Sequence, residues 1–134
     1  MTMRNKDQQG QSLVEIAVTM PILILVLMGI LDLGRAYWTY ITLSDAAAEG
    51  AAYAALNPTD TAQAIARAAD SSNGLIELDT AMITVTHGEL SAGNPITVTV
   101  QFEYVLWTPI MRDLVGETLL MSSSMAQPII GEGF

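Results

Sequence analysis

Apolar positions follow two different patterns along the chain. Residues 13–31 form one long apolar run, interrupted only by Glu15, Thr19, Pro21 and Gly29. At 1.5 Å per residue this run spans roughly 29 Å as a helix, close to the ~30 Å hydrocarbon thickness of a membrane. Residues 96–106 instead alternate between apolar and polar side chains. The first pattern predicts a transmembrane helix, and the second predicts a strand with one buried face.

The helical pattern continues beyond the apolar run. Residues 33–56 contain no proline, and Asn57-Pro58 supplies a stop signal. We therefore predict one helix over residues 11–56, about 69 Å long, with a transmembrane part at 13–31 and a stalk at 32–56. Aromatic rings suited to a headgroup boundary follow the apolar run; they are Tyr37, Trp38 and Tyr40.

Basic residues indicate how this helix is oriented. Arg4 and Lys6 precede the run, whereas only Arg35 follows it closely, so we expect a cytoplasmic N-terminus and an extracytoplasmic C-terminal domain. The run is too long and too uniformly apolar for a soluble core helix. It is also longer than the apolar region of a cleavable secretory signal, and the nearest small-x-small site lies far downstream, at residues 46–48.

Small residues at four-residue spacing fill the stalk. Such rows allow close approach between helix backbones, so we predict helix packing at Gly29, Gly34, Ala47, Gly50, Ala51 and Ala54. Two alternatives remain open for the stalk, namely packing against neighbouring subunits and packing against the chain's own outer domain. Asp32 and Arg35, three residues apart, are expected to form a weak local ion pair.

Residues 57–134 predict a small outer domain. A short helix follows Pro58, with Thr59 or Asp60 as its cap and Asn73-Gly74 after its end; its expected apolar stripe is Ala62, Ile65, Ala66 and Ala69. Three strands follow, within residues 82–87, 96–107 and 118–126, with residues 107–117 as a connecting loop. The inward positions are expected to be Ile83 and Val85, then Ile96, Val98, Val100, Phe102, Tyr104 and Leu106, and finally Leu119, Met121 and Met125. The predicted fold class is α+β, with an antiparallel sheet covering the distal half of the long helix.

Charge and chemistry narrow the functional classes. The net charge is −9, and the acidic body disfavours binding to nucleic acid. The chain has no cysteine and one histidine, His87, and its carboxylates Asp60, Asp70, Glu77 and Asp79 lack EF-hand spacing. We therefore expect no enzyme activity, no cofactor and no metal site.

The N-terminal residues resemble a known family. Gly10 followed by "QSLVE" is similar to the type IV prepilin signal, in which a peptidase cuts after glycine and glutamate is the fifth mature residue. Residues 10–58, including "LDLGRAYW" and the alanine-rich continuation, resemble the TadE-like proteins of tight-adherence pilus systems. The resemblance implies a leader at residues 1–10, cleavage between Gly10 and Gln11, and Glu15 as the fifth mature residue.

The same resemblance implies a pilin-like subunit that begins in the bacterial inner membrane and ends in an extracellular filament. Its implied partners are copies of itself or other pilins, a prepilin peptidase, an inner-membrane assembly platform and an assembly ATPase. Ile16 stands where major pilins of the system often have tyrosine, which favours a minor pilin or pseudopilin. The alternative is an unprocessed single-pass membrane protein whose outer domain binds a ligand.

The physical chemistry of two residues fits this interpretation. A carboxylate near hydrocarbon is costly unless it is paired or neutralised, and cleavage would create an ammonium on Gln11 that can meet Glu15 of a neighbouring subunit. Such a pair would fix the axial register between chains. Pro21 leaves the carbonyl of Ala17 without its helical partner, so the helix is expected to bend there.

Overall fold

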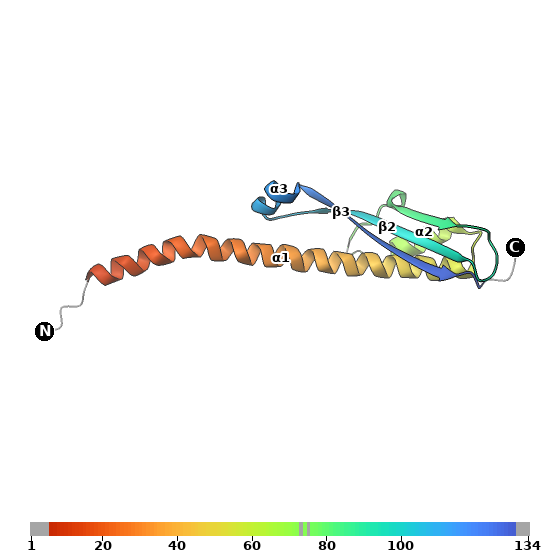
Figure 1. Ribbon diagram of the computed structural model, residues 1–134, viewed down its shortest axis with the longest axis horizontal. Helices are drawn as coiled ribbons and strands as arrows, with labels where there is room; N and C mark the ends of the chain where they lie inside the picture. The colour runs from red at the N-terminus through yellow and green to blue at the C-terminus, as the bar shows by residue number, and fades with distance from the viewer. Residues whose placement is uncertain (1–5, 73, 75, 131–134) are drawn as a thin grey trace.

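The computed structural model describes residues 6–72, 74 and 76–130. Figure 1 shows an elongated molecule in which one long helix carries a small domain along its distal part. The expected leader residues 1–5, and Asn73 after the short helix, lie outside the described residues.

The long helix α1 (Lys6–Leu56) is the longest element of the molecule, and the outer domain packs on its distal half. It begins five residues before the predicted start at Gln11 and runs unbroken through Gly10. It ends at the predicted place, where Asn57 and Pro58 stop the helix. Pro21 lies inside it, and Figure 1 shows a bend in the N-terminal half of the helix.

A second helix, α2 (Thr61–Asp70), begins where the sequence predicts. The Asp60 carboxylate caps it by accepting a hydrogen bond of 3.2 Å from the Gln63 N–H. The predicted apolar stripe is only partly right. Ile65 and Ala69 are half-buried and pack against the core, but the fully buried residues are Ala64 and Ala68, and Ala62 is exposed. The helix is rotated because it packs simultaneously on α1 and on β1.

A three-stranded antiparallel sheet in the order β1-β2-β3 completes the domain. A short 3₁₀ turn, η1 (Thr80–Met82), leads into β1 (Ile83–His87), which pairs with β2 (Pro95–Val105). The third strand, β3 (Thr118–Pro128), pairs with β2 along its whole length. This architecture confirms the predicted α+β fold, with the sheet packed on the distal half of α1.

The core lies between the sheet, α2 and the distal half of α1. Its fully enclosed larger side chains are Leu43 from the helix, Ile96, Val98 and Val100 from β2, and Ile129 after β3. The alternation predicted for residues 96–106 is confirmed, because Tyr104 and Leu106 are buried on the same strand face. In β3, Met121 and Met125 are half-buried, whereas Leu119 is exposed.

The segment between β2 and β3 contains a short helix, α3 (Pro109–Val115), where the sequence predicted a loop. Pro109 occupies the first turn, where its missing N–H costs nothing and its fixed φ favours a helix. The helix ends at Gly116, whose φ of +107° favours glycine. The Leu106 N–H donates to the Glu117 carbonyl over 3.3 Å, and this hydrogen bond joins the two ends of the segment between β2 and β3.

Candidate functional site

Among the described residues, no helix or strand packs over most of the N-terminal half of α1. Every large apolar side chain from Leu13 to Leu31 is between 39% and 68% exposed. By length and composition α1 is also the one helix among the described residues that could cross a membrane, and its most apolar window is not buried inside the molecule. A core helix of a soluble protein would be covered, so this surface is built to face lipid or other helices.

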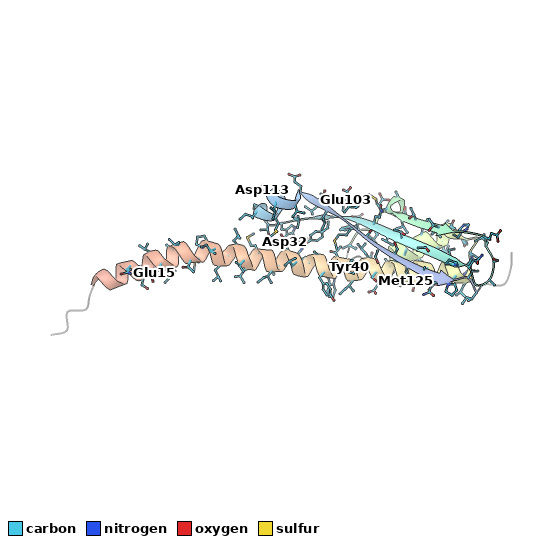
Figure 2. The ribbon with its side chains drawn as sticks, viewed as in Figure 1. Glu15, Asp32, Tyr40, Glu103, Asp113 and Met125 are labelled. Atoms are coloured by element: carbon cyan, nitrogen blue, oxygen red, sulfur yellow. The ribbon has the colours of Figure 1, made fainter. Side chains whose placement is uncertain are left out.

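Glu15 is an exposed carboxylate within this apolar surface. Its side chain accepts a hydrogen bond of 3.4 Å from the Gln11 amide one turn earlier, and its backbone carbonyl accepts one of 2.7 Å from the Thr19 hydroxyl. Figure 2 shows Glu15 on the part of α1 that extends beyond the outer domain. Within the described chain, then, Gln11 is the side chain that hydrogen-bonds this carboxylate.

The glycines of α1 divide into two groups. A Cβ added at Gly10, Gly29 or Gly34 would meet no atom within 4 Å. A Cβ at Gly50 would lie 3.0 Å from the Ala68 Cβ and 3.2 Å from the Ala64 carbonyl oxygen. The packing of α2 on α1 therefore favours glycine at Gly50, whereas no contact among the described residues explains glycine at the other three positions.

The stalk has a covered face and an open face. Four of the predicted packing residues are buried against the chain's own domain; they are Ala47, Gly50, Ala51 and Ala54. For these four, the structure favours the intramolecular alternative. On the open face the apolar surface of the N-terminal half continues through the exposed Tyr37 and Ile41. It is followed at helical spacing by the small side chains of Ser44, Ala48 and Ala52, of which Ser44 and Ala48 are half-buried.

A polar cluster, which we call the anchor cluster (Asp32, Arg35, Tyr104, Trp107 and Thr108), joins α1 to the far end of β2. The buried Asp32 carboxylate accepts hydrogen bonds from the Trp107 N–H over 3.2 Å and from the Thr108 N–H over 2.7 Å. The Tyr104 hydroxyl donates to the Asp32 backbone carbonyl over 3.1 Å. The cluster therefore fixes the outer domain at the point where the apolar run ends.

Arg35 completes the anchor cluster from the next turn of α1. Its guanidinium lies 3.5 Å from the Asp32 carboxylate and 3.6 Å from the centre of the Trp107 ring. The predicted local pair exists, but no local pattern predicted the aromatic partner or the backbone amides. Burial raises the pKa of Tyr104, while the Arg35 charge lowers it and the Asp32 charge raises it.

Two other polar contacts among the described residues lie away from the anchor cluster. Arg67 pairs with Glu49 at 3.6 Å across α2 and α1, with both side chains about half exposed. His87 is exposed, and its Nδ1 lies 2.9 Å from the Gly88 carbonyl oxygen. Across residues 6–72, 74 and 76–130, no three acidic or histidine side chains come together as a metal site would require.

Comparison with known proteins agrees with the N-terminal resemblance. The family model described as TadE-like protein matches residues 10–52, which include Glu15, the anchor residue Asp32 and most of the stalk. No curated protein and no solved structure matches the chain. This family is structural rather than enzymatic. The resemblance to TadE-like proteins is thus confirmed over residues 10–52, and together with the long apolar helix it indicates a membrane-anchored, pilin-like protein associated with a pilus.

Proposed function

We propose that this chain is a minor pilin or pseudopilin of a tight-adherence pilus, processed after Gly10 and assembled through α1. The supporting observation is the uncovered apolar surface of residues 13–31, which continues along the open face of the stalk. In the membrane this surface contacts lipid, and in a filament it contacts the same surface of neighbouring subunits. Assembly then exchanges lipid contacts for helix–helix contacts, with the work supplied by the platform and its ATPase.

Processing is proposed at the peptide bond between Gly10 and Gln11. Gly10 is exposed, and open space surrounds the position of its missing side chain. Since the monomer does not require glycine there, the requirement is assigned to the prepilin peptidase that must bind this segment. The bond lies inside α1, so the peptidase has to unwind the first turns of the helix to reach it.

Glu15 is proposed to set the axial register between subunits. After cleavage Gln11 carries an ammonium, and the Glu15 carboxylate of an adjacent subunit can pair with it. Unpaired, this carboxylate would be costly in an apolar environment. A pair of this kind favours one axial offset between neighbouring helices over the many offsets that a uniformly apolar surface permits.

The processing step is tested by comparing Gly10→Leu with Gly34→Leu in cells that contain the peptidase. Both positions are exposed helical glycines with open space around them, so the two variants differ in position rather than in local strain. Intact mass is expected to show full-length Gly10→Leu and normally shortened Gly34→Leu. A shortened Gly10→Leu chain would refute cleavage at this bond.

The register step is tested by comparing Glu15→Ala with Glu103→Ala. Glu103 is an exposed carboxylate on β2, well away from Glu15 (Figure 2). Glu15→Ala is expected to be cleaved normally but to reduce the yield of this subunit in sheared filaments, while Glu103→Ala leaves that yield unchanged. A normal yield of Glu15→Ala would remove the register role. Residues 1–10 retained in the wild-type mature protein would instead favour the unprocessed, ligand-binding alternative.

A further inference from the structure

The connection between β2 and β3, together with the first residues of β3, exposes many apolar side chains. In this segment, which we call the tip (residues 106–120), Leu114 is 77% exposed and Trp107 is 62% exposed. The helix α3 within the tip has no buried residue. The other exposed apolar side chains of the tip are Ile110, Val115, Leu119 and Leu120. An apolar patch of this kind marks a surface that contacts something other than water.

The tip lies at the level where the apolar run of α1 ends. Its base is held there by the backbone amides of Trp107 and Thr108, which donate to the carboxylate of Asp32. The tip is also fixed internally, because the Arg112 Nε donates to the Leu106 carbonyl over 2.7 Å. Figures 1 and 2 show α3 beside α1 at this level, projecting from the end of the sheet.

An apolar cavity of about 240 Å³ separates the tip from α1. On the helix side it is lined by Gly29 and Leu33, which lie at the end of the apolar run, and by Ala36. On the tip side it is lined by Met111, Val115 and Leu119. Asp32 also lines the cavity, and its carboxylate accepts hydrogen bonds from the Trp107 and Thr108 N–H groups at the base of the tip. Beside it, the apolar surface of α1 continues through the cavity onto the tip.

We propose that the tip is a second membrane contact, which rests in the outer interfacial layer of the same membrane that α1 crosses. If residues 13–31 fill the hydrocarbon, the rigid anchor cluster places the tip at the headgroup boundary. Leu114, Ile110 and Val115 then enter the acyl region, and Trp107 lies at the interface, which indole rings prefer. The inference depends on membrane anchoring by α1, and not on cleavage at Gly10 or on filament assembly.

The lipid surface is favoured over a second copy of the chain as the partner. The apolar side chains of the tip are continuous with the surface of residues 13–31, which must face hydrocarbon before any assembly. Asp113 lies on the side of α3 directed away from α1 (Figure 2), which leaves the apolar side chains of α3 to occupy the remaining faces. This division resembles that of an interfacial helix, with one polar side in water and an apolar side in lipid.

The proposal is tested with the full chain in phosphatidylcholine–phosphatidylglycerol vesicles that contain lipids brominated at different acyl depths. The chain has two tryptophans, so Trp38→Phe leaves Trp107 as the only reporter. Bromine near the headgroup end of the acyl chain is expected to quench Trp107 fluorescence at least twofold more than bromine near the bilayer centre. Trp107 that is quenched by aqueous acrylamide but by none of the brominated lipids would overturn the proposal.

A matched pair of charge substitutions locates the contact. Leu114→Asp places a charge on the tip, and Leu56→Asp places one at the opposite end of α1, where the native leucine is 57% exposed. In the Trp38→Phe background, Leu114→Asp is expected to reduce the lipid quenching of Trp107 at least twofold, while Leu56→Asp leaves it unchanged. Equal quenching in the two variants, with unchanged circular dichroism, would contradict the proposal. Quenching that depends on protein concentration and not on bromine would show instead that the tip contacts a second copy.

Discussion

The two halves of α1 form one continuous helix but carry side chains of different size. Residues 13–31 carry bulky apolar groups that no other part of the molecule covers, whereas residues 43–55 carry mostly alanine and glycine under the outer domain. Bulky side chains maximise contact with a surrounding medium, while small ones let other elements approach the helix backbone. Side-chain size, and not apolar character alone, therefore determines what can pack on each half.

The largest contrast is expected in chemical accessibility. Because the chain has no native cysteine, Leu23→Cys and Ala52→Cys each introduce a single thiol at an exposed position. In lipid vesicles a water-soluble maleimide should label residue 23 roughly tenfold more slowly than residue 52, since hydrocarbon disfavours the reactive thiolate. Similar labelling rates in vesicles would show that the first half does not lie in the membrane. Similar rates for the two thiols in the unfolded, denaturant-solubilised chain serve as the control.

Glycine substitutions should distinguish the part of α1 that the outer domain covers from the uncovered helix before it. Gly50→Leu forces a side chain against Ala68 and the Ala64 backbone, which is expected to lower the free energy of unfolding by about 3 kcal/mol. Gly34→Leu meets open space and should be neutral or stabilising by up to about 1 kcal/mol, because glycine is a poor helix former. Thermal unfolding of both variants in detergent checks the difference. Equal loss in both would contradict the assignment of Gly50 to the domain contact.

The anchor cluster lies between the two halves. Its disruption should lower the free energy of unfolding somewhat less than Gly50→Leu does. Asp32→Ala leaves the N–H groups of Trp107 and Thr108 without their acceptor, at a cost of about 2 kcal/mol in unfolding free energy. Asp113→Ala, at an exposed carboxylate of α3, is the control and should change stability by less than about 0.5 kcal/mol. Unfolding curves that cannot distinguish Asp32→Ala from the control would show that the anchor contributes nothing.

The smallest effect is expected from the Tyr104 hydroxyl. Tyr104→Phe removes the hydrogen bond to the Asp32 carbonyl and should cost about 1 kcal/mol. Burial raises the pKa of Tyr104, so its stabilising contribution is complete below the unfolded pKa of about 10 and is lost as pH rises through the folded value. The wild type should therefore lose its advantage over Tyr104→Phe at alkaline pH. An advantage that persists unchanged through this range would assign the stability to the ring alone.

Most of the fold could be predicted from local patterns. The helix over residues 11–56, its stop at Asn57-Pro58 and the alternating strand depend on short-range rules of helix capping and strand periodicity. The alternation correctly placed Val98 and Tyr104 on the inner face of β2. These features need no knowledge of distant partners, which is why the sequence alone was sufficient.

The errors concern features that depend on distant partners. The centre of the buried side of α2, at Ala64 and Ala68, was missed because it is set by contact with Gly50 and β1. Asp32 could be paired only with its neighbour Arg35, since its main hydrogen-bond donors lie more than 70 residues away in sequence. Pro109 and Gly116 were signals for a short helix within the predicted loop, and they were the one local clue that the interpretation overlooked.

The N-terminal residue of the mature protein decides whether the proposed pairing between subunits can form. That pairing requires an ammonium on Gln11 that can meet Glu15 of another subunit. Amino-terminal sequencing of this chain from filaments sheared off the cell surface should therefore begin with Gln11. Surface material that still begins with Met1 would contradict the account, because the pairing group would never have formed.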